Sequence, residues 1–215
     1  MCDMNELMNR YHIMRHGQSK ANVLGIIVSC PDNDRNGDYG LTKLGQEQAL
    51  AAASASGLPP DTVIYSSDFS RARETAEIVR ARLGAPEVRL ATALRERCFG
   101  SWEGTDTANY AKVWAADEAG PTGEAGTADE AGTADEAGGP TENTQTESDV
   151  EPPSAVLHRL TVLIASLEQE YTGQDILLVS HGDTLQILQA GCLHMNPARH
   201  RQLPHLETAG IRRIT

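Results

Sequence analysis

The sequence predicts an α/β fold in which helices cover both faces of a doubly wound, mostly parallel sheet. Short apolar or β-branched runs alternate along the chain with longer segments of helical character, and this alternation is typical of strand–helix–strand units. One run, residues 176–179, is apolar at every position, as expected for a strand buried on both faces of a parallel sheet. With 215 residues, the chain is long enough to bury a core without disulfides or metals.

The first half of the chain contains two predicted strands and two predicted helices. Residues 11–14 form a short apolar run, and residues 62–65 are β-branched or aromatic between turn residues, so both are expected to be strands. Residues 43–56 are rich in Leu, Ala and Gln, and Thr42 precedes them as a candidate helix cap. A further helix is expected over 70–83.

The second half continues the alternation. Apolar residues recur every three or four positions from Leu157 to Leu167, which predicts an amphipathic helix. Ser154 is the candidate cap of this helix. The strand at 176–179 follows, and another helix is expected from Thr184.

Residues 117–150 differ from the rest of the chain in composition. The hexapeptide Glu-Ala-Gly-Thr-Ala-Asp occurs at 124–129 and again at 130–135, and residues 117–151 hold eleven acidic side chains and no Lys or Arg. The net charge of −12 therefore arises mainly in this segment. Because it has few residues that could form a core, we expect a disordered or weakly ordered surface insertion in a single domain spanning 1–215. The alternative is a docking segment for a basic partner.

Composition also argues against several classes of protein. The four cysteines form no Cys-x-x-Cys pair, which argues against a zinc knot or a disulfide framework and suits a reducing compartment. The first ten residues contain two acidic side chains and no apolar run, and no apolar stretch approaches the ~18 residues of a membrane helix. These features predict a cytoplasmic protein that does not bind membrane. Because no broad basic surface can be identified, we also expect no binding of nucleic acid. The oligomeric state stays open.

Two segments with the same pattern suggest a functional site. Residues 13–19 and 178–184 each have apolar strand residues, one polar residue, His-Gly, and two further polar residues. In open α/β sheets the ligand lies beyond the carboxyl ends of the strands. This rule predicts that His16 and His181 lie near one another at that edge of the sheet. The glycine after each histidine would allow a sharp turn and a close approach of backbone to a ligand.

The chemistry of this edge suits an anion better than a metal ion. Two histidines could bind a metal, but a third ligand would be needed, and the positive charge of Arg15 next to His16 would oppose a cation. The remaining histidines lack the strand-end context, and we expect them to be structural: His12, His158, His194, His200 and His205.

Several motifs, in order, resemble those of a known family. Residues 15–22 read Arg-His-Gly-Gln-Ser-Lys-Ala-Asn, residues 66–76 contain Ser-Ser-x-x-x-Arg-Ala-x-x-Thr-Ala, and residues 94–104 contain Leu-x-Glu-x-x-x-Gly-x-Trp-Glu-Gly. Residues 179–182 read Val-Ser-His-Gly, and residues 207–211 are similar to a C-terminal strand of the same family. Together they resemble the histidine phosphatase superfamily, in its phosphoglycerate mutase-like branch.

The resemblance covers about 11–115 and 147–215 and implies a phosphoglycerate mutase-like fold. It implies that a phosphohistidine forms on the first histidine of the pattern, that a carboxyl group acts as general acid, and that no cofactor is needed. Glutamine at position 18, where the family more often has Glu, leaves the nucleophile unaffected, and residues 23–40 do not align. The implied catalytic residues are His16, Glu96 and His181, and the implied phosphate-binding residues are Arg15, Asn22, Arg71 and Gly182.

Some neighbouring residues of these motifs are expected to be structural. Without the resemblance, Glu96 would be interpreted as a surface residue paired with Arg95 or Arg97. Phe99 and Trp102 are expected to pack rather than to stack on substrate. Cys98 is expected to be a small buried hydrophobe.

The resemblance leaves three functions open. Mutases of the family carry additional basic residues after the third motif, whereas this chain has Lys112 and then only acidic side chains. We therefore expect a phosphatase acting on a small phosphorylated metabolite, with a phosphoglycerate mutase-type phosphotransferase as the alternative. A non-catalytic phosphate-binding module that uses the acidic repeat to recruit a partner is the third possibility.

Overall fold

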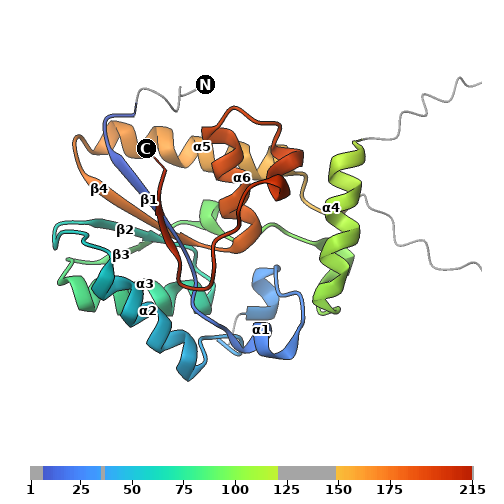
Figure 1. The fold of residues 1–215 in the computed structure, drawn as a ribbon, viewed down its shortest axis with the longest axis horizontal. Helices are drawn as coiled ribbons and strands as arrows, with labels where there is room; N and C mark the ends of the chain where they lie inside the picture. The colour runs from blue at the N-terminus through green and yellow to red at the C-terminus, as the bar shows by residue number, and fades with distance from the viewer. Residues whose placement is uncertain (1–6, 35–36, 121–148, 215) are drawn as a thin grey trace, which may run out of the picture.

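A computed structural model describes residues 7–34, 37–120 and 149–214. Its centre is a five-stranded sheet of order β3-β2-β4-β1-β5, in which only the edge strand β5 runs antiparallel to its neighbour (Figure 1). The strands are β1 (Arg10–Arg15), β2 (Val63–Ser66), β3 (Val88–Leu90), β4 (Asp175–Ser180) and β5 (Ile211–Arg213). The mostly parallel sheet confirms the predicted fold class.

Helices cover both faces of this sheet, with α2 and α3 on one face and α5 and α6 on the other (Figure 1). The α-helices are α1 (Lys20–Leu24), α2 (Lys43–Ala55), α3 (Ser70–Leu83), α4 (Tyr110–Ala119), α5 (Pro153–Glu170) and α6 (Gly182–Cys192). Short 3-10 helices include η1 (Pro31–Asp34), η2 (Thr92–Leu94), η3 (Gly100–Trp102), η4 (Thr107–Asn109) and η6 (Pro197–Gln202). Within the described ranges, no helix is long and apolar enough to span a membrane.

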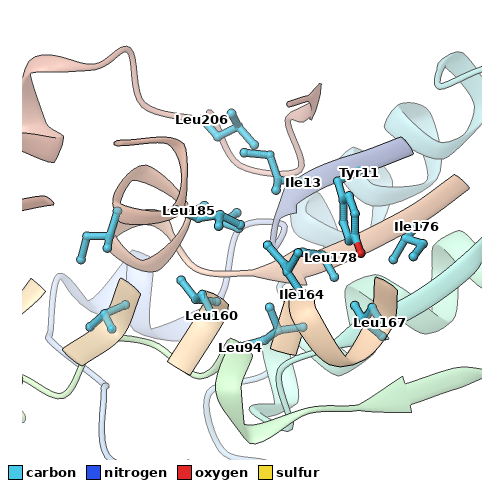
Figure 2. Packing of buried hydrophobic residues seen from close by; sticks show 13 residues of the cluster. Tyr11, Ile13, Leu94, Leu160, Ile164, Leu167, Ile176, Leu178, Leu185 and Leu206 are labelled. Atoms are coloured by element: carbon cyan, nitrogen blue, oxygen red, sulfur yellow. The ribbon is translucent and has the colours of Figure 1, made fainter. Parts of the chain in front are cut away.

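Each face of the sheet packs its own core because strand side chains alternate between the faces. On the α5–α6 face, Ile13 of β1 and Leu178 of β4 pack against Leu160, Ile164 and other buried side chains (Figure 2). On the other face, Met14 and its neighbours pack against small residues, mostly alanines, of α2 and α3. The continuous apolar run of β4 has side chains in both cores, as predicted for a central parallel strand.

The strand predictions at 11–14, 62–65 and 176–179 are confirmed to within one residue at each end. The helix predicted over 70–83 has those bounds, and the helix after Thr42 ends one residue earlier than predicted. The Thr42 hydroxyl accepts a hydrogen bond from the Gly45 N–H at 3.0 Å, which confirms it as a cap. The short edge strand β3 was not predicted.

Three predicted boundaries are wrong. Ser154 does not cap α5, because the helix already begins at Pro153, which needs no N–H partner in the first turn. Helix α6 begins at Gly182 rather than Thr184. The C-terminal strand begins only at Ile211, because residues 207–210 form a turn closed by a backbone hydrogen bond.

The first residues of the predicted acidic insertion, 117–150, are part of a helix, which corrects the prediction at this end. Residues 117–119 belong to α4, and the Asp117 carboxylate forms a bidentate ion pair with the buried Arg97, with N–O distances of 2.6 and 2.7 Å. After the segment, the Ser101 N–H donates to Asp149 at 2.7 Å. The repeats at 124–135 lie outside the described residues.

Candidate active site

The register of the two central strands brings the two His-Gly segments together. Arg15 of β1 lies opposite Ser180 of β4, and the His16 N–H donates to the Ser180 carbonyl at 3.0 Å. The ring centroids of His16 and His181 are consequently 5.2 Å apart. The carboxyl end of β2 lies beside them, because the Ser67 N–H donates to the carbonyl of Val179 in β4.

A cavity of about 240 Å³ opens at this edge of the sheet. Six of the seven predicted site residues line it, namely Arg15, His16, Asn22, Arg71, Glu96 and Gly182. The seventh, His181, is fully buried against the ring of His16. We call Arg15, His16, Arg71, Glu96 and His181 the floor of the cavity.

The hydrogen bonds of His16 fix which ring nitrogen can react. Nδ1 lies 2.8 Å from the carbonyl oxygen of Gly17, which can only accept, so Nδ1 carries the proton. Nε2 therefore holds a lone pair and accepts a hydrogen bond from Arg71 Nε at 3.2 Å. Burial, and then the charges of Arg71 and Arg15, lower the pKa of His16 well below its usual value. The hydrogen bonds and the lowered pKa both favour a neutral imidazole whose lone pair is on Nε2.

Two arginines bring positive charge to this nitrogen. The Arg71 guanidinium is buried and donates from Nη2 to the Val28 carbonyl at 2.8 Å. Arg15 donates from Nη1 to the Leu206 carbonyl at 3.1 Å. In the described part of the chain, the buried side-chain N and O atoms without a hydrogen-bond partner are Arg15 Nε, Arg71 Nη1 and His181 Nδ1. All three belong to the floor.

The His181 ring is held between Phe69 and His16, with both ring centroids 5.2 Å away. Its Nε2 lies 2.9 Å from the hydroxyl oxygen of Ser67. Burial, and then the positive charge of Arg71, lower the pKa of His181 well below its usual value. Of the two predicted forms, protonated imidazolium or neutral N–H donor, this environment favours the neutral ring.

Glu96 is 9% exposed and lies between opposing charges. Its Oε1 accepts from the Arg97 N–H at 3.0 Å and from the Thr184 N–H at 3.3 Å. Burial, and then the charge of Asp183, raise the pKa of Glu96, and the charge of Arg71 only partly opposes this. Because Oε1 is occupied by N–H donors, a proton on this carboxyl group is held on Oε2.

Asn22 and Gly182 both lie in the cavity wall, and each also lies at the start of a helix. The Asn22 side-chain oxygen caps α1 by accepting from the Ser19 N–H at 3.0 Å, which leaves its NH₂ group for a ligand. Gly182 begins α6, where backbone N–H groups lack partners within the helix. An added Cβ there would lie 3.5 Å from Arg15 Nε.

Two backbone segments near the cavity have structural roles. In the first turn of α3, the Asp34 carboxylate binds the Ser70 N–H and hydroxyl. The glycine after His16 was expected to approach a ligand. Instead, an added Cβ at Gly17 would lie 2.3 Å from the carbonyl oxygen of Gly45, so this glycine allows α2 to pack against the loop.

The cavity-wall residues that sequence reasoning missed include Tyr110, Trp114, Arg201 and His205. We call these four the rim. Tyr110 and Trp114 come from α4, and their rings stack with centroids 5.3 Å apart. Arg201 comes from η6. No motif surrounds these residues, and His205 was expected to be structural although it lies in the wall.

Asp183 joins α4 and η6 to the start of α6. Its carboxylate accepts from Trp114 Nε1 at 2.9 Å, lies 2.8 Å from His200 Nε2, and is 3.3 Å from Arg97. Burial alone would raise the pKa of Asp183, but His200 and then the arginines hold it below the usual value. Helix α4 is thereby fixed over the cavity.

Most other predicted structural roles agree with the structure. His12 pairs with Asp175 at 2.9 Å, and His200 is buried beside Asp183. Phe99 is fully buried in a small core cluster. Cys98 is only partly buried, and its sulfur lies 3.5 Å from that of Cys30, outside the cavity.

The donor set of the floor suits an anion. The two histidine rings have guanidinium groups as neighbours, which attract negative charge. Among the described residues, no three His, Cys, Asp or Glu side chains are grouped so that they could hold a metal ion.

Comparison with known proteins identifies the family. The model of the histidine phosphatase superfamily (branch 1) matches residues 11–215. The chain belongs to this superfamily.

Its relatives include more than one kind of enzyme. A glucosyl-3-phosphoglycerate phosphatase of Mycobacterium tuberculosis is 31% identical over 191 residues, covering 86% of this chain and 76% of the relative. A 2,3-bisphosphoglycerate-dependent phosphoglycerate mutase of Parvibaculum lavamentivorans is 26% identical over 188 residues, covering 82% and 76%. The solved structure of a mycobacterial glucosyl-3-phosphoglycerate phosphatase with VO3 superposes with a TM-score of 0.67 at 26% identity, covering 94% of this chain and 90% of that one.

Proposed function

We propose that this histidine phosphatase family member hydrolyses a small phosphorylated metabolite through a phosphohistidine on His16. In the first step the lone pair of His16 Nε2 attacks phosphorus, the bond from phosphorus to the leaving oxygen breaks, and Glu96 donates its proton to that oxygen. In the second step water attacks phosphorus, Glu96 accepts a proton from the water, and the P–N bond breaks to release inorganic phosphate. Two displacements thereby replace one difficult step.

The observation that carries this proposal is the set of unpartnered nitrogens around His16. Arg15 Nε and Arg71 Nη1 are buried N–H donors with no partner in the described chain, and His181 Nδ1 is a third nitrogen without one. In the tautomer whose Nε2 accepts from the Ser67 hydroxyl, His181 Nδ1 is also an N–H donor. Buried donors without partners are rare in folded proteins because they lose their bonds to water. A phosphoryl group has three oxygens that would accept from them, and stabilising its charge is the main task in phosphoryl transfer.

The charge states of the two reacting groups support the same chemistry. A lowered pKa keeps His16 neutral and nucleophilic near pH 7. A raised pKa favours the protonated form of Glu96, which a general acid needs. Arg71 lies against His16 Nε2 through a 3.2 Å hydrogen bond, so a bound phosphoryl group would take over this donor and free the nucleophile.

Turnover of p-nitrophenyl phosphate by the full chain tests this proposal. We expect His16→Ala to lower kcat by about 10⁴-fold, the scale of losing a nucleophile. His158→Ala, which removes an exposed histidine from α5, should keep the wild-type rate. Undiminished turnover in His16→Ala would refute the assigned nucleophile.

A mutase-type phosphotransferase is the second candidate, because a mutase aligns with most of the chain. Lys112, the basic residue after the third motif, argues against it, since its Nζ lies over the ring of Trp102, 5.3 Å from the centroid, and outside the cavity. Incubation with 3-phosphoglycerate and 2,3-bisphosphoglycerate decides between them. We expect inorganic phosphate as the product, whereas formation of 2-phosphoglycerate would identify a mutase.

The third possibility, a non-catalytic binding module, predicts no turnover on any phosphomonoester. The floor argues against it, because a binding module needs neither a neutral nucleophile nor a buried acid beside it. We also propose that the chain is one domain with the acidic segment inserted between α4 and α5, since all five strands share one sheet.

A further inference from the structure

Arg201 is a cation of the cavity wall that the proposed phosphoryl chemistry does not use. It reaches the cavity from η6, which follows α6 along the chain, and His181 is the floor residue nearest to it in sequence. Its guanidinium carbon lies 3.7 Å from the ring centroid of Trp114. Trp114 in turn stacks on Tyr110, with an angle of 7° between the rings. The guanidinium therefore lies against the face of an aromatic stack.

This placement leaves part of the guanidinium available. In the described chain, Arg201 makes its hydrogen bond from Nη1, to the side-chain oxygen of Gln186. Its distance to Asp183 is 4.0 Å, too long for a hydrogen bond. Nε and Nη2 remain as donors on a side chain that is 29% exposed.

Arg201 has no close carboxylate of its own among the described residues. The carboxylate within ion-pair distance, that of Asp183, lies 4.0 Å away and is contacted more closely by His200 at 2.8 Å and by Arg97 at 3.3 Å. A phosphate dianion would be matched by the two floor arginines. The guanidinium of Arg201 then remains as a cation without a close anionic partner.

We infer that Arg201 binds a carboxylate of the substrate, so that the substrate is a small phosphorylated carboxylic acid. The inference rests on the proposed function, since it concerns the same cavity. The planar fork of a guanidinium matches the two oxygens of a carboxylate. A second phosphate would be expected to gather several cations, as the floor does, whereas the rim offers Arg201 and a histidine, His205, that already pairs with Glu207 at 3.2 Å.

The dimensions of the cavity limit the size of this acid. Its volume of about 240 Å³ lies below the ~300–1,000 Å³ of sites for larger ligands. The rim and the floor line one continuous cavity, so the carboxylate and the phosphate belong to the same small molecule. Arg201 is thus a specificity-determining residue.

A matched pair of substrates tests this inference. 3-Phosphoglycerate and glycerol 3-phosphate share a carbon skeleton and differ in that one has a carboxylate where the other has a hydroxymethyl group. We expect wild-type kcat/KM to favour 3-phosphoglycerate about tenfold to a hundredfold, the range expected for charge-assisted hydrogen bonds. Arg201→Gln should remove this preference, mainly by raising KM for 3-phosphoglycerate.

Two further variants serve as controls for the position of the charge and for the shape of the guanidinium group. Arg199→Gln removes the same charge from the same 3-10 helix, but Arg199 lines a neighbouring hollow, so the preference should persist. Arg201→Lys keeps the charge without the fork and should restore only part of the preference. Thermal melting of each variant shows whether it is folded.

The possible outcomes separate the carboxylate inference from the proposed function. If wild type turns over p-nitrophenyl phosphate but does not prefer 3-phosphoglycerate, or if Arg201→Gln keeps the preference, the inference is wrong and the proposed function stands. If Arg201→Gln lowers turnover of both substrates equally, Arg201 contacts the phosphate instead. Better turnover of a bisphosphate than of 3-phosphoglycerate would assign Arg201 to a second phosphate.

If wild type turns over no phosphomonoester, the proposed function fails, and calorimetric titration of the same two compounds still tests the carboxylate site. Tenfold tighter binding of 3-phosphoglycerate that is lost in Arg201→Gln would support the site. Equal binding of the two compounds would overturn it.

Discussion

The floor and the rim line one cavity, but the chain builds them in different ways. Floor residues such as His16 and His181 directly follow strands, so the register of the sheet positions them. Trp114 and Arg201 of the rim come from a helix and a 3-10 helix that contact Asp183, at the start of α6, through the side chains of Trp114 and His200. If the proposed roles hold, the sheet positions the residues of the chemistry, whereas the residues of substrate choice depend on a polar network that can vary separately.

The largest effect is expected at the floor, from Glu96→Gln. Loss of a general acid should lower kcat about 10²–10⁴-fold on an alkyl phosphate. The loss on p-nitrophenyl phosphate should be smaller, because its leaving group needs less help from an acid. Glu77→Gln, an exposed change on α3, is the control. An equal, small effect on both substrates would remove Glu96 from the mechanism.

The same variant has a predicted pH signature. The pKa of His16 is lowered, so activity should persist as the pH falls to 6.5 and be lost only below it, when His16 becomes protonated. The pKa of Glu96 is raised, so activity should fall as the pH rises through that value and the acid loses its proton. Glutamine does not titrate, so this upper limb of the kcat profile should disappear in Glu96→Gln.

The buried polar network around Asp183 is tested by Arg97→Gln. Arg97 is 1% exposed and binds Asp117 and Asp183, so its loss removes the bidentate partner of Asp117 and one of the partners of Asp183. We expect the free energy of unfolding to fall by about 3–5 kcal/mol in urea titrations. The adjacent Arg95→Gln breaks a partly exposed pair with Asp68 and should cost at most about 1 kcal/mol. Similar losses in both variants would contradict the assigned role of the network.

Two deletions locate the boundary between the rim helix and the acidic segment. Replacing 121–147 with a flexible Gly-Ser linker should leave the free energy of unfolding almost unchanged, as expected from its low-complexity composition. Starting the deletion at 117 also removes Asp117, the bidentate partner of Arg97, and should cost about 1.5–3 kcal/mol more. Equal stability of the two variants would mean that α4 is not anchored by this pair.

The smallest effect is expected at the rim, from Trp114→Phe. The change removes the Nε1 donor to Asp183 and weakens the surface on which Arg201 lies. We expect a loss of about 1 kcal/mol, seen as a roughly fivefold higher KM for 3-phosphoglycerate with kcat nearly unchanged. Trp102→Phe, in the neighbouring hollow, should leave KM as it is. A large fall in kcat for Trp114→Phe would place the indole in the chemistry instead.

The fold and the floor were predictable from sequence because both depend on local signals. The run before His181 is apolar at every position, which marks a central strand, and a polar group just after such a strand lies at the ligand edge. Glu96 was the exception, because its position became interpretable only through the family motif. Its burial depends on contacts with Thr184 that no local pattern reveals.

The rim was not predictable, because its residues are brought together by contacts between segments that are distant in sequence. Arg201 and Trp114 meet only because both lie near Asp183, which is distant from Trp114 in sequence. The capping of α3 by Asp34 was missed because Asp34 lies in a segment without a recognisable pattern. Gly17 was misinterpreted because its close neighbour is the backbone of α2, a contact set by tertiary packing.

The central claim is that His16 forms a bond to phosphorus during turnover. Wild-type protein mixed with substrate, quenched within milliseconds in alkali, and digested for mass spectrometry tests it directly. We expect one phosphoryl group on the peptide that contains His16, stable in alkali, lost on brief acid treatment, and absent in His16→Ala. A phosphoryl group on another residue, or its absence when release of p-nitrophenol from p-nitrophenyl phosphate shows a pre-steady-state burst, would contradict the account.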